Sequence, residues 1–96
     1  MAIVYIATNT QNGAAYVGVT TLSLLSRRRT HESEARRNIY DHAFHAAIRT
    51  NASAFEWRVL STHASVVEAI QAEAVAIAEV SPAYNSGRAG AGRFGP

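Results

Sequence analysis

The chain contains no cysteine and no lysine, and it has no long apolar run. The lack of cysteine excludes disulfides and thiolate metal sites, and it favours a cytoplasmic protein, because small secreted domains usually depend on disulfides. The apolar stretch near the N-terminus is too short for a signal peptide or a membrane span. With 96 residues, 48% of them hydrophobic and 17% charged, the composition predicts one small globular domain.

The basic residues are unusual in kind rather than in number. All nine are arginine, and five of them lie between Arg27 and Arg37. Guanidinium groups are planar, permanently charged and suited to bidentate contacts with phosphate. A cluster of this kind predicts contacts to a nucleic-acid backbone or, alternatively, a simple solvated helix face. The residues expected in one of these two roles are Arg28, Arg29, Arg36 and Arg37.

The spacing of apolar and polar residues along the chain predicts six elements in the order strand, strand, helix, helix, strand, helix. The first strand is apolar on both faces, so we expect it inside a sheet that helices cover. The third strand alternates and is expected at a sheet edge. The second helix is expected to be capped by Asp41, and the last by a capping box that begins at Ser65. The predicted ranges are strands 2–7, 15–19 and 55–60, and helices from a cap at Thr21 or Ser23 to 37, from 42 to 50 and from 66 to 79.

Asn12 and Gly13 are the strongest hairpin signal in the chain, because both residues tolerate positive φ. If they form the centre of the turn, Ala7 faces Gly18 and Tyr5 faces Thr20. Tyr5 and Tyr16 then project from one face of the sheet, and small residues between them leave a depression. A longer turn would change this register.

Three helical residues are unexpectedly polar for their positions. Arg27 and His31 are four residues apart, on one stripe of the first helix, where they suit a phosphate or form a solvated face. Glu73 falls in the middle of the apolar stripe of the last helix, between Ile70 and Ile77. A carboxylate there needs a partner, either an arginine or a divalent cation such as Mg²⁺.

Other polar residues carry weaker signals. Tyr5 and Tyr16 are expected either to be buried core aromatics or to belong to an active site. An ordinary phenol has a pKa near 10, so it is a poor base at neutral pH. His42 and His45 form an i, i+3 pair, but the sequence shows no third ligand at suitable spacing, so a zinc site is not expected.

Taken in order, these residues resemble the GIY-YIG nuclease superfamily over residues 3–87. Ile3-Val4-Tyr5 stands where the family has Gly-Ile-Tyr, and Tyr16-Val17-Gly18 stands for Tyr-Ile-Gly. Arg27 and His31 match the family's Arg-x-x-x-His, Glu73 its metal-binding glutamate, and Ala83-Tyr84-Asn85 its closing Gly-Tyr-Asn. Ile3 and Ala83 depart from the family's glycines, but neither position supplies a catalytic side chain.

The resemblance implies an α+β fold of order ββααβα, with a three-stranded antiparallel sheet flanked by helices. It implies a metal-dependent DNA endonuclease in which Glu73 binds Mg²⁺ or Mn²⁺. In that picture Tyr5, assisted by Tyr16, activates water, and Arg27 stabilises charge on phosphorus. His31 aids proton transfer, and Asn85 shapes the site.

We expect the nuclease domain over residues 1–85 and a Gly/Ala/Arg tail over residues 86–96. Without an added recognition domain, sequence preference should be weak, or targeting should depend on DNA structure or on a partner protein. One alternative is a nucleic-acid-binding module that keeps the fold but has little or no activity. Another is an assembly protein without nucleic-acid affinity, which the arginine cluster disfavours.

Overall fold

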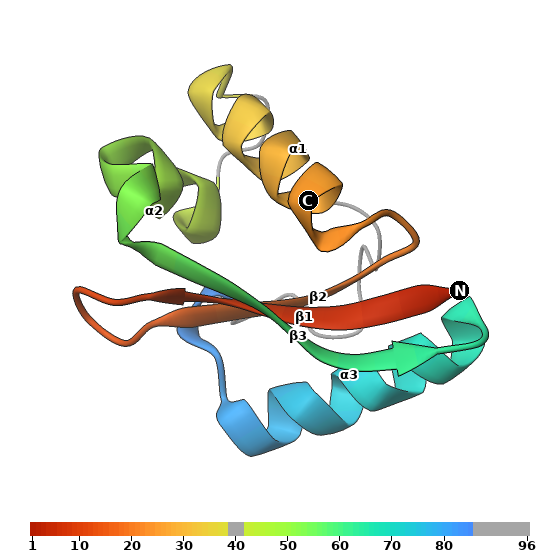
Figure 1. Cartoon of the computed structure of the whole chain (residues 1–96). Helices are drawn as coiled ribbons and strands as arrows, with labels where there is room; N and C mark the ends of the chain where they lie inside the picture. Colours follow the sequence, from red (N-terminus) through yellow and green to blue (C-terminus); the bar gives the residue numbers. More distant parts are fainter. Residues whose placement is uncertain (39–41, 86–96) are drawn as a thin grey trace.

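A computed structural model describes residues 1–38 and 42–85 of the protein, and its elements follow the predicted order ββααβα (Figure 1). The fold is α+β, as predicted. Asp41, the predicted helix cap, and the predicted tail lie outside the described residues. The elements are β1 (Ala2–Asn9), β2 (Ala15–Thr20), α1 (Leu24–Arg36), α2 (Ala43–Asn51), η1 (Ala52–Ala54), β3 (Phe55–His63), α3 (Val66–Val80) and η2 (Ala83–Asn85).

The sheet has three antiparallel strands in the order β2-β1-β3. The apolar strand β1 is therefore central and hydrogen-bonded on both sides, which confirms the prediction made from its two apolar faces. β3 lies at an edge, also as predicted, but it continues three residues beyond Leu60, to His63. Its pairing with β1 is interrupted by an irregularity between Val4 and Tyr5.

The predicted hairpin register is wrong by two residues. Tyr5 pairs with Gly18 and Ala7 pairs with Tyr16, because the turn contains four residues rather than two. Asn9 closes this longer turn: its N–H donates to Ala14 at 2.8 Å, and its side-chain oxygen accepts from the N–H of residue 11 at 3.0 Å. A shift of two residues preserves the faces of a strand, so the prediction that Tyr5 and Tyr16 share one face is confirmed.

Helices cover the sheet from both sides (Figure 1). α1 and α2 pack on the face that carries both tyrosines, whereas α3 packs on the opposite face. The α1/α2 side is built around Tyr5, Tyr16, Ala35, Phe44 and Ile48. The α3 side is built largely from small and β-branched residues, with buried members Ala2, Val4, Ile6, Ala15, Val17, Val19 and Ala69.

The helix ends follow local capping chemistry. Ser23 caps α1, since its hydroxyl accepts from the N–H of Ser26 at 3.1 Å. Asn38 follows the end of α1 with a positive φ of 53°, the left-handed conformation in which helices commonly end. Ser65 caps α3 by accepting from the N–H of Glu68 at 3.2 Å, which is one of the two hydrogen bonds of the predicted capping box. None of the helices in the described part of the chain has the length and apolar character needed to cross a membrane.

Candidate active site

The hydroxyl of Tyr5 lies between two polar groups from α1. It is 2.8 Å from Nε2 of His31, and Nε of Arg27 donates to it at 3.4 Å. Arg27 and His31 are one helical turn apart, and this spacing places both side chains over the same strand residue. The structure thus brings together three of the predicted site residues, two from a helix and one from the central strand.

Tyr5 is held in place by its neighbours. The side chain is fully buried, and Trp57 of β3 stacks on the phenol ring with the ring centroids 6.1 Å apart. The phenol extends over Gly18 of β2, where a Cβ atom would lie only 2.6 Å from the Tyr5 hydroxyl. The absence of a side chain at Gly18 is therefore what lets the Tyr5 phenol pass over β2.

The ring of Tyr16 lies beside this group. Its ring centroid is 6.3 Å from that of Tyr5 and 5.5 Å from that of His31. The ring stacks nearly parallel on Phe44 of α2 at 4.3 Å. Tyr16 therefore also links the site to the α1/α2 core.

Burial keeps both Tyr5 and His31 uncharged. Desolvation raises the pKa of the Tyr5 phenol well above its usual value of 10, and the neighbouring Tyr16 adds to this, while Arg27 opposes it. Desolvation also lowers the pKa of His31 to about 2, supported by the positive charge of Arg27. At neutral pH the pair is therefore a neutral phenol hydrogen-bonded to a neutral imidazole.

Glu73 is buried on α3, which confirms its predicted inward position. It lies on a helix that covers the opposite face of the sheet from the two tyrosines. Its negative charge nevertheless contributes to the raised pKa of Tyr5, so the carboxylate lies within electrostatic range of the phenol. A buried carboxylate oxygen near the site is a suitable ligand for a hard cation such as Mg²⁺ or Mn²⁺.

Asn85 contacts the main chain of β2. Its Oδ1 accepts from the N–H of Val17 at 2.7 Å, and its Nδ2 donates to the carbonyl of Val17 at 2.8 Å. Val17 lies between Tyr16 and Gly18, so Asn85 fixes the strand that forms the floor of the site. The preceding Tyr84 accepts a hydrogen bond from Asn9 at 3.2 Å, which anchors the short helix η2 near the start of the hairpin turn.

The other arginines of α1 and its C-cap are more exposed than the buried group. Arg28 pairs with Glu32 at 3.1 Å, one turn further along the helix. Arg29, Arg36 and Arg37 are exposed. These three side chains are available to a polyanion, whereas Arg28 is partly committed to its ion pair.

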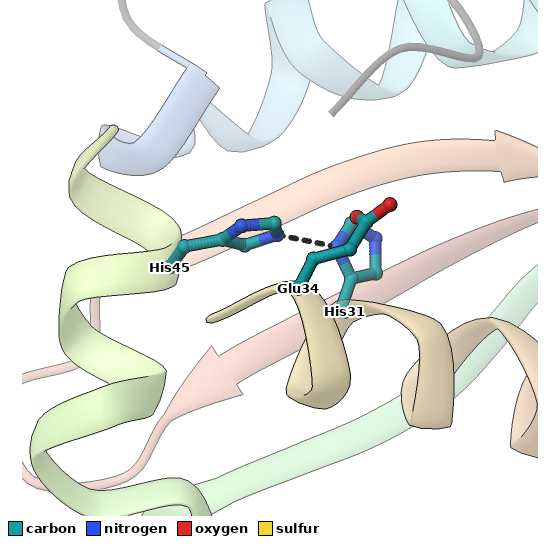
Figure 2. Close-up of side chains that lie close together, drawn as sticks. All are labelled: His31, Glu34 and His45. Atoms are coloured by element: carbon teal, nitrogen blue, oxygen red, sulfur yellow. Dashed lines mark hydrogen bonds between the residues drawn. The ribbon is translucent and has the colours of Figure 1, made fainter. Parts of the chain in front are cut away.

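Two residues near the site were not singled out as site residues from the sequence. His45 of α2 is fully buried, and its Nε2 lies 2.9 Å from Nδ1 of His31 (Figure 2). The sequence did contain a signal for the burial of His45, because it lies next to Phe44 and three residues before Ile48, and both of these are apolar residues of the buried side of α2. Trp57, which stacks on Tyr5, lies two residues after the buried Phe55 in a strand whose alternation indicated its inward face.

A buried phenol, an arginine and a histidine over one sheet, with a carboxylate in electrostatic range, form a group suited to phosphodiester hydrolysis. The model of the GIY-YIG catalytic domain matches the chain over residues 1–85. The protein therefore belongs to the GIY-YIG family of endonucleases, as its motifs indicated. No curated protein sequence matches the chain significantly.

Two solved structures are similar in fold. One is the catalytic domain of the intron endonuclease I-TevI in a mutant form, with a TM-score of 0.73, 19% identity and coverage of 84% of this chain and 86% of that one. The other is the catalytic domain of the homing endonuclease I-TevI, with a TM-score of 0.72, 18% identity and coverage of 84% and 89%. At this level of identity the likeness concerns the fold.

Proposed function

We propose that this GIY-YIG domain is a metal-dependent endonuclease that hydrolyses phosphodiester bonds of DNA. The observation that carries the proposal is the Tyr5 hydroxyl, buried and held between Nε of Arg27 and Nε2 of His31. Such an arrangement places a proton donor or acceptor beside a permanent positive charge, the two functions that hydrolysis of a phosphodiester needs.

In the proposed reaction a water oxygen forms a bond to phosphorus while one P–O ester bond breaks, and the ester oxygen leaves with the electron pair of that bond and takes a proton from solvent. The proton of the water passes to the Tyr5–His31 pair, in which the phenol oxygen is the first acceptor and its own proton moves to Nε2. Bound phosphate is negatively charged and raises the pKa of His31, which makes this transfer easier than in the free protein. Arg27 stabilises the negative charge that grows on the phosphate oxygens.

Glu73 is the proposed ligand for Mg²⁺ or Mn²⁺. It fits a hard cation because it offers buried carboxylate oxygen whose charge already acts on Tyr5. When bound, the cation supplies charge neutralisation at the scissile phosphate. The proposed role of Asn85 is to position Tyr16 and Gly18 through β2.

The exposed arginines outside the buried group indicate how the domain would bind its DNA substrate. Arg29, Arg36 and Arg37 are exposed on one helix and would contact backbone phosphates, which carry no sequence information. We therefore propose weak intrinsic sequence preference, or direction by DNA structure or a partner protein. Binding should weaken steeply with salt concentration.

The test is a nicking assay on supercoiled plasmid with the wild type, Glu73→Gln and the matched control Glu68→Gln, which lies exposed in the first turn of α3. We expect nicking with Mg²⁺ or Mn²⁺, none with chelator, and at least a 100-fold loss in Glu73→Gln only. DNA affinity, measured by gel retardation, should stay within about threefold. Salt-sensitive binding without cleavage by the wild type would instead support an inactive nucleic-acid-binding module.

A further inference from the structure

The side of His31 that faces away from Tyr5 belongs to a second polar cluster. One ring nitrogen of His31, one of His45 and a carboxylate oxygen of Glu34 lie within 4.8 Å of one another. Nδ1 of His31 and Nε2 of His45 are the nitrogens that face each other (Figure 2). His31 and Glu34 are one turn apart on α1, and His45 lies across from them on α2. The proposed hydrolysis uses Nε2 of His31, so it leaves this cluster without a function.

The protonation states of the cluster suit metal ligation. A metal ion binds only neutral imidazole and ionised carboxylate, and burial already keeps His31 neutral. Glu34 provides the carboxylate. Within the described ranges, its Oε1 is a buried atom for which no hydrogen-bond partner is found. A buried, unsatisfied carboxylate oxygen is costly, and a cation would remove that cost.

The distances also suit a small transition-metal ion. Zinc binds imidazole nitrogen at about 2.0–2.1 Å in tetrahedral geometry, which places two ligand nitrogens about 3.3 Å apart. The two ring nitrogens are 2.9 Å apart, so they would need to separate by only about 0.4 Å. Two histidines and one carboxylate are a ligand set found at catalytic zinc and non-haem iron sites, with a further position left for water.

We propose that Nδ1 of His31, Nε2 of His45 and the carboxylate of Glu34 form a binding site for Zn²⁺ or a similar divalent transition metal. This site is separate from the hard-cation site at Glu73 and does not depend on the identity of the nucleic-acid substrate.

The residues around the proposed metal site, Tyr5 and Arg27, favour metal binding by His31. The hydroxyl of Tyr5 holds the other nitrogen of His31, as outer hydrogen-bond partners of metal-ligating histidines commonly do. Arg27, the cation that acts on His31, is hydrogen-bonded to Tyr5 on the Nε2 side of the ring, away from the proposed metal position. Metal on Nδ1 would place the ring proton on Nε2, so that His31 would donate to the Tyr5 hydroxyl and could not at the same time accept its proton, as it does in the hydrolysis proposed above.

The test is a titration of the metal-free 96-residue chain with Co²⁺, a spectroscopic substitute for Zn²⁺. We expect one equivalent of Co²⁺ to give the visible bands of a four- or five-coordinate site and one equivalent of Zn²⁺ to abolish them. Glu34→Gln and His45→Gln should each weaken binding at least 10-fold. The controls are Glu32→Gln on the same helix and His63→Gln on β3, with Glu73→Gln to separate the two metal sites. Circular dichroism would confirm that each variant is folded.

The proposal predicts equal Co²⁺ binding by the wild type, the two controls and Glu73→Gln. It also predicts that Zn²⁺ at 100 times its wild-type Kd raises the wild-type Tm by about 10 °C or more, and the Tm of Glu34→Gln by about half of that rise or less. The proposal is overturned if no visible band forms, or if binding is unchanged in Glu34→Gln and His45→Gln. Loss of binding in Glu73→Gln alone would also overturn it and would assign the ion to the other site.

Discussion

Replacing Gly18 with alanine tests whether the close approach of the Tyr5 phenol to β2 organises the site. The added Cβ would lie 2.6 Å from the Tyr5 hydroxyl, 2.7 Å from Cζ and 3.0 Å from Cε2 of Tyr16. To reach the 3.4 Å at which ordinary contact begins, the phenol oxygen must retreat by about 0.8 Å. Tyr5 is fully buried beneath Trp57 and bonded to His31, so it has no free space to enter.

The expected effects on stability and on activity differ in size. Overpacking of this kind costs about 1–3 kcal/mol, and the better strand propensity of alanine offsets about 0.5–1 kcal/mol of it. The Tm of Gly18→Ala should therefore fall by about 5–15 °C, as calorimetry would measure. A displacement of the catalytic hydroxyl by almost 1 Å should reduce plasmid nicking about 100-fold at a temperature where the variant is folded.

Gly13→Ala is the matched control for that substitution. Gly13 has a φ of 77° in the hairpin turn, and a Cβ there would meet no atom within 4 Å. Its backbone strain should cost about 1–2 kcal/mol without moving Tyr5, so the Tm should fall while nicking stays near wild type. If Gly18→Ala kept both its Tm and its activity, the close approach of Tyr5 would not constrain the site.

Two further predictions concern stability. The pKa of His31 is lowered to about 2 from an ordinary value of 6.5, so the unfolded chain binds a proton that the folded protein excludes. The stabilisation from neutral His31 should be complete above pH 6.5 and be lost as pH falls below it, by at most about 1.4 kcal/mol per unit, and urea unfolding of His31→Gln should show a flatter acid profile. Asn85→Ala removes two hydrogen bonds to Val17 and leaves buried main-chain groups unpaired, so denaturant unfolding should show a loss of about 2–3 kcal/mol. Asn85→Ala variants with wild-type stability would refute the bracing role of this side chain.

The order of the elements could be predicted because each carries a local signal. The two apolar faces of β1, the alternation from Phe55 and the caps at Ser23 and Ser65 are read from neighbouring residues alone. The hairpin register could not be predicted in the same way. It depends on whether the turn is closed at Asn9 or at Gln11, and the side chain of Asn9 decides this by capping a turn of four residues.

The part of the candidate site that lies on one helix could be predicted from the spacing of its residues in the sequence. Arg27 and His31 share a stripe, and that stripe does face Tyr5. The pairing of His31 with His45 was not predictable, because it depends on how α1 and α2 lie across one another on the sheet. For the same reason, the face of the sheet that α3 covers could not be derived from the periodicity of α3.

The central position of β1 has a consequence for the motions of the site. β1 is hydrogen-bonded to strands on both sides, so its amides should exchange with solvent only in the rarest openings of the fold. α1, which supplies Arg27 and His31, begins after a loop, has only His31 and Ala35 fully buried and can open at lower free energy. The phenol thus belongs to the most persistent part of the protein, and its two partners belong to a part that can separate from it while the sheet remains intact.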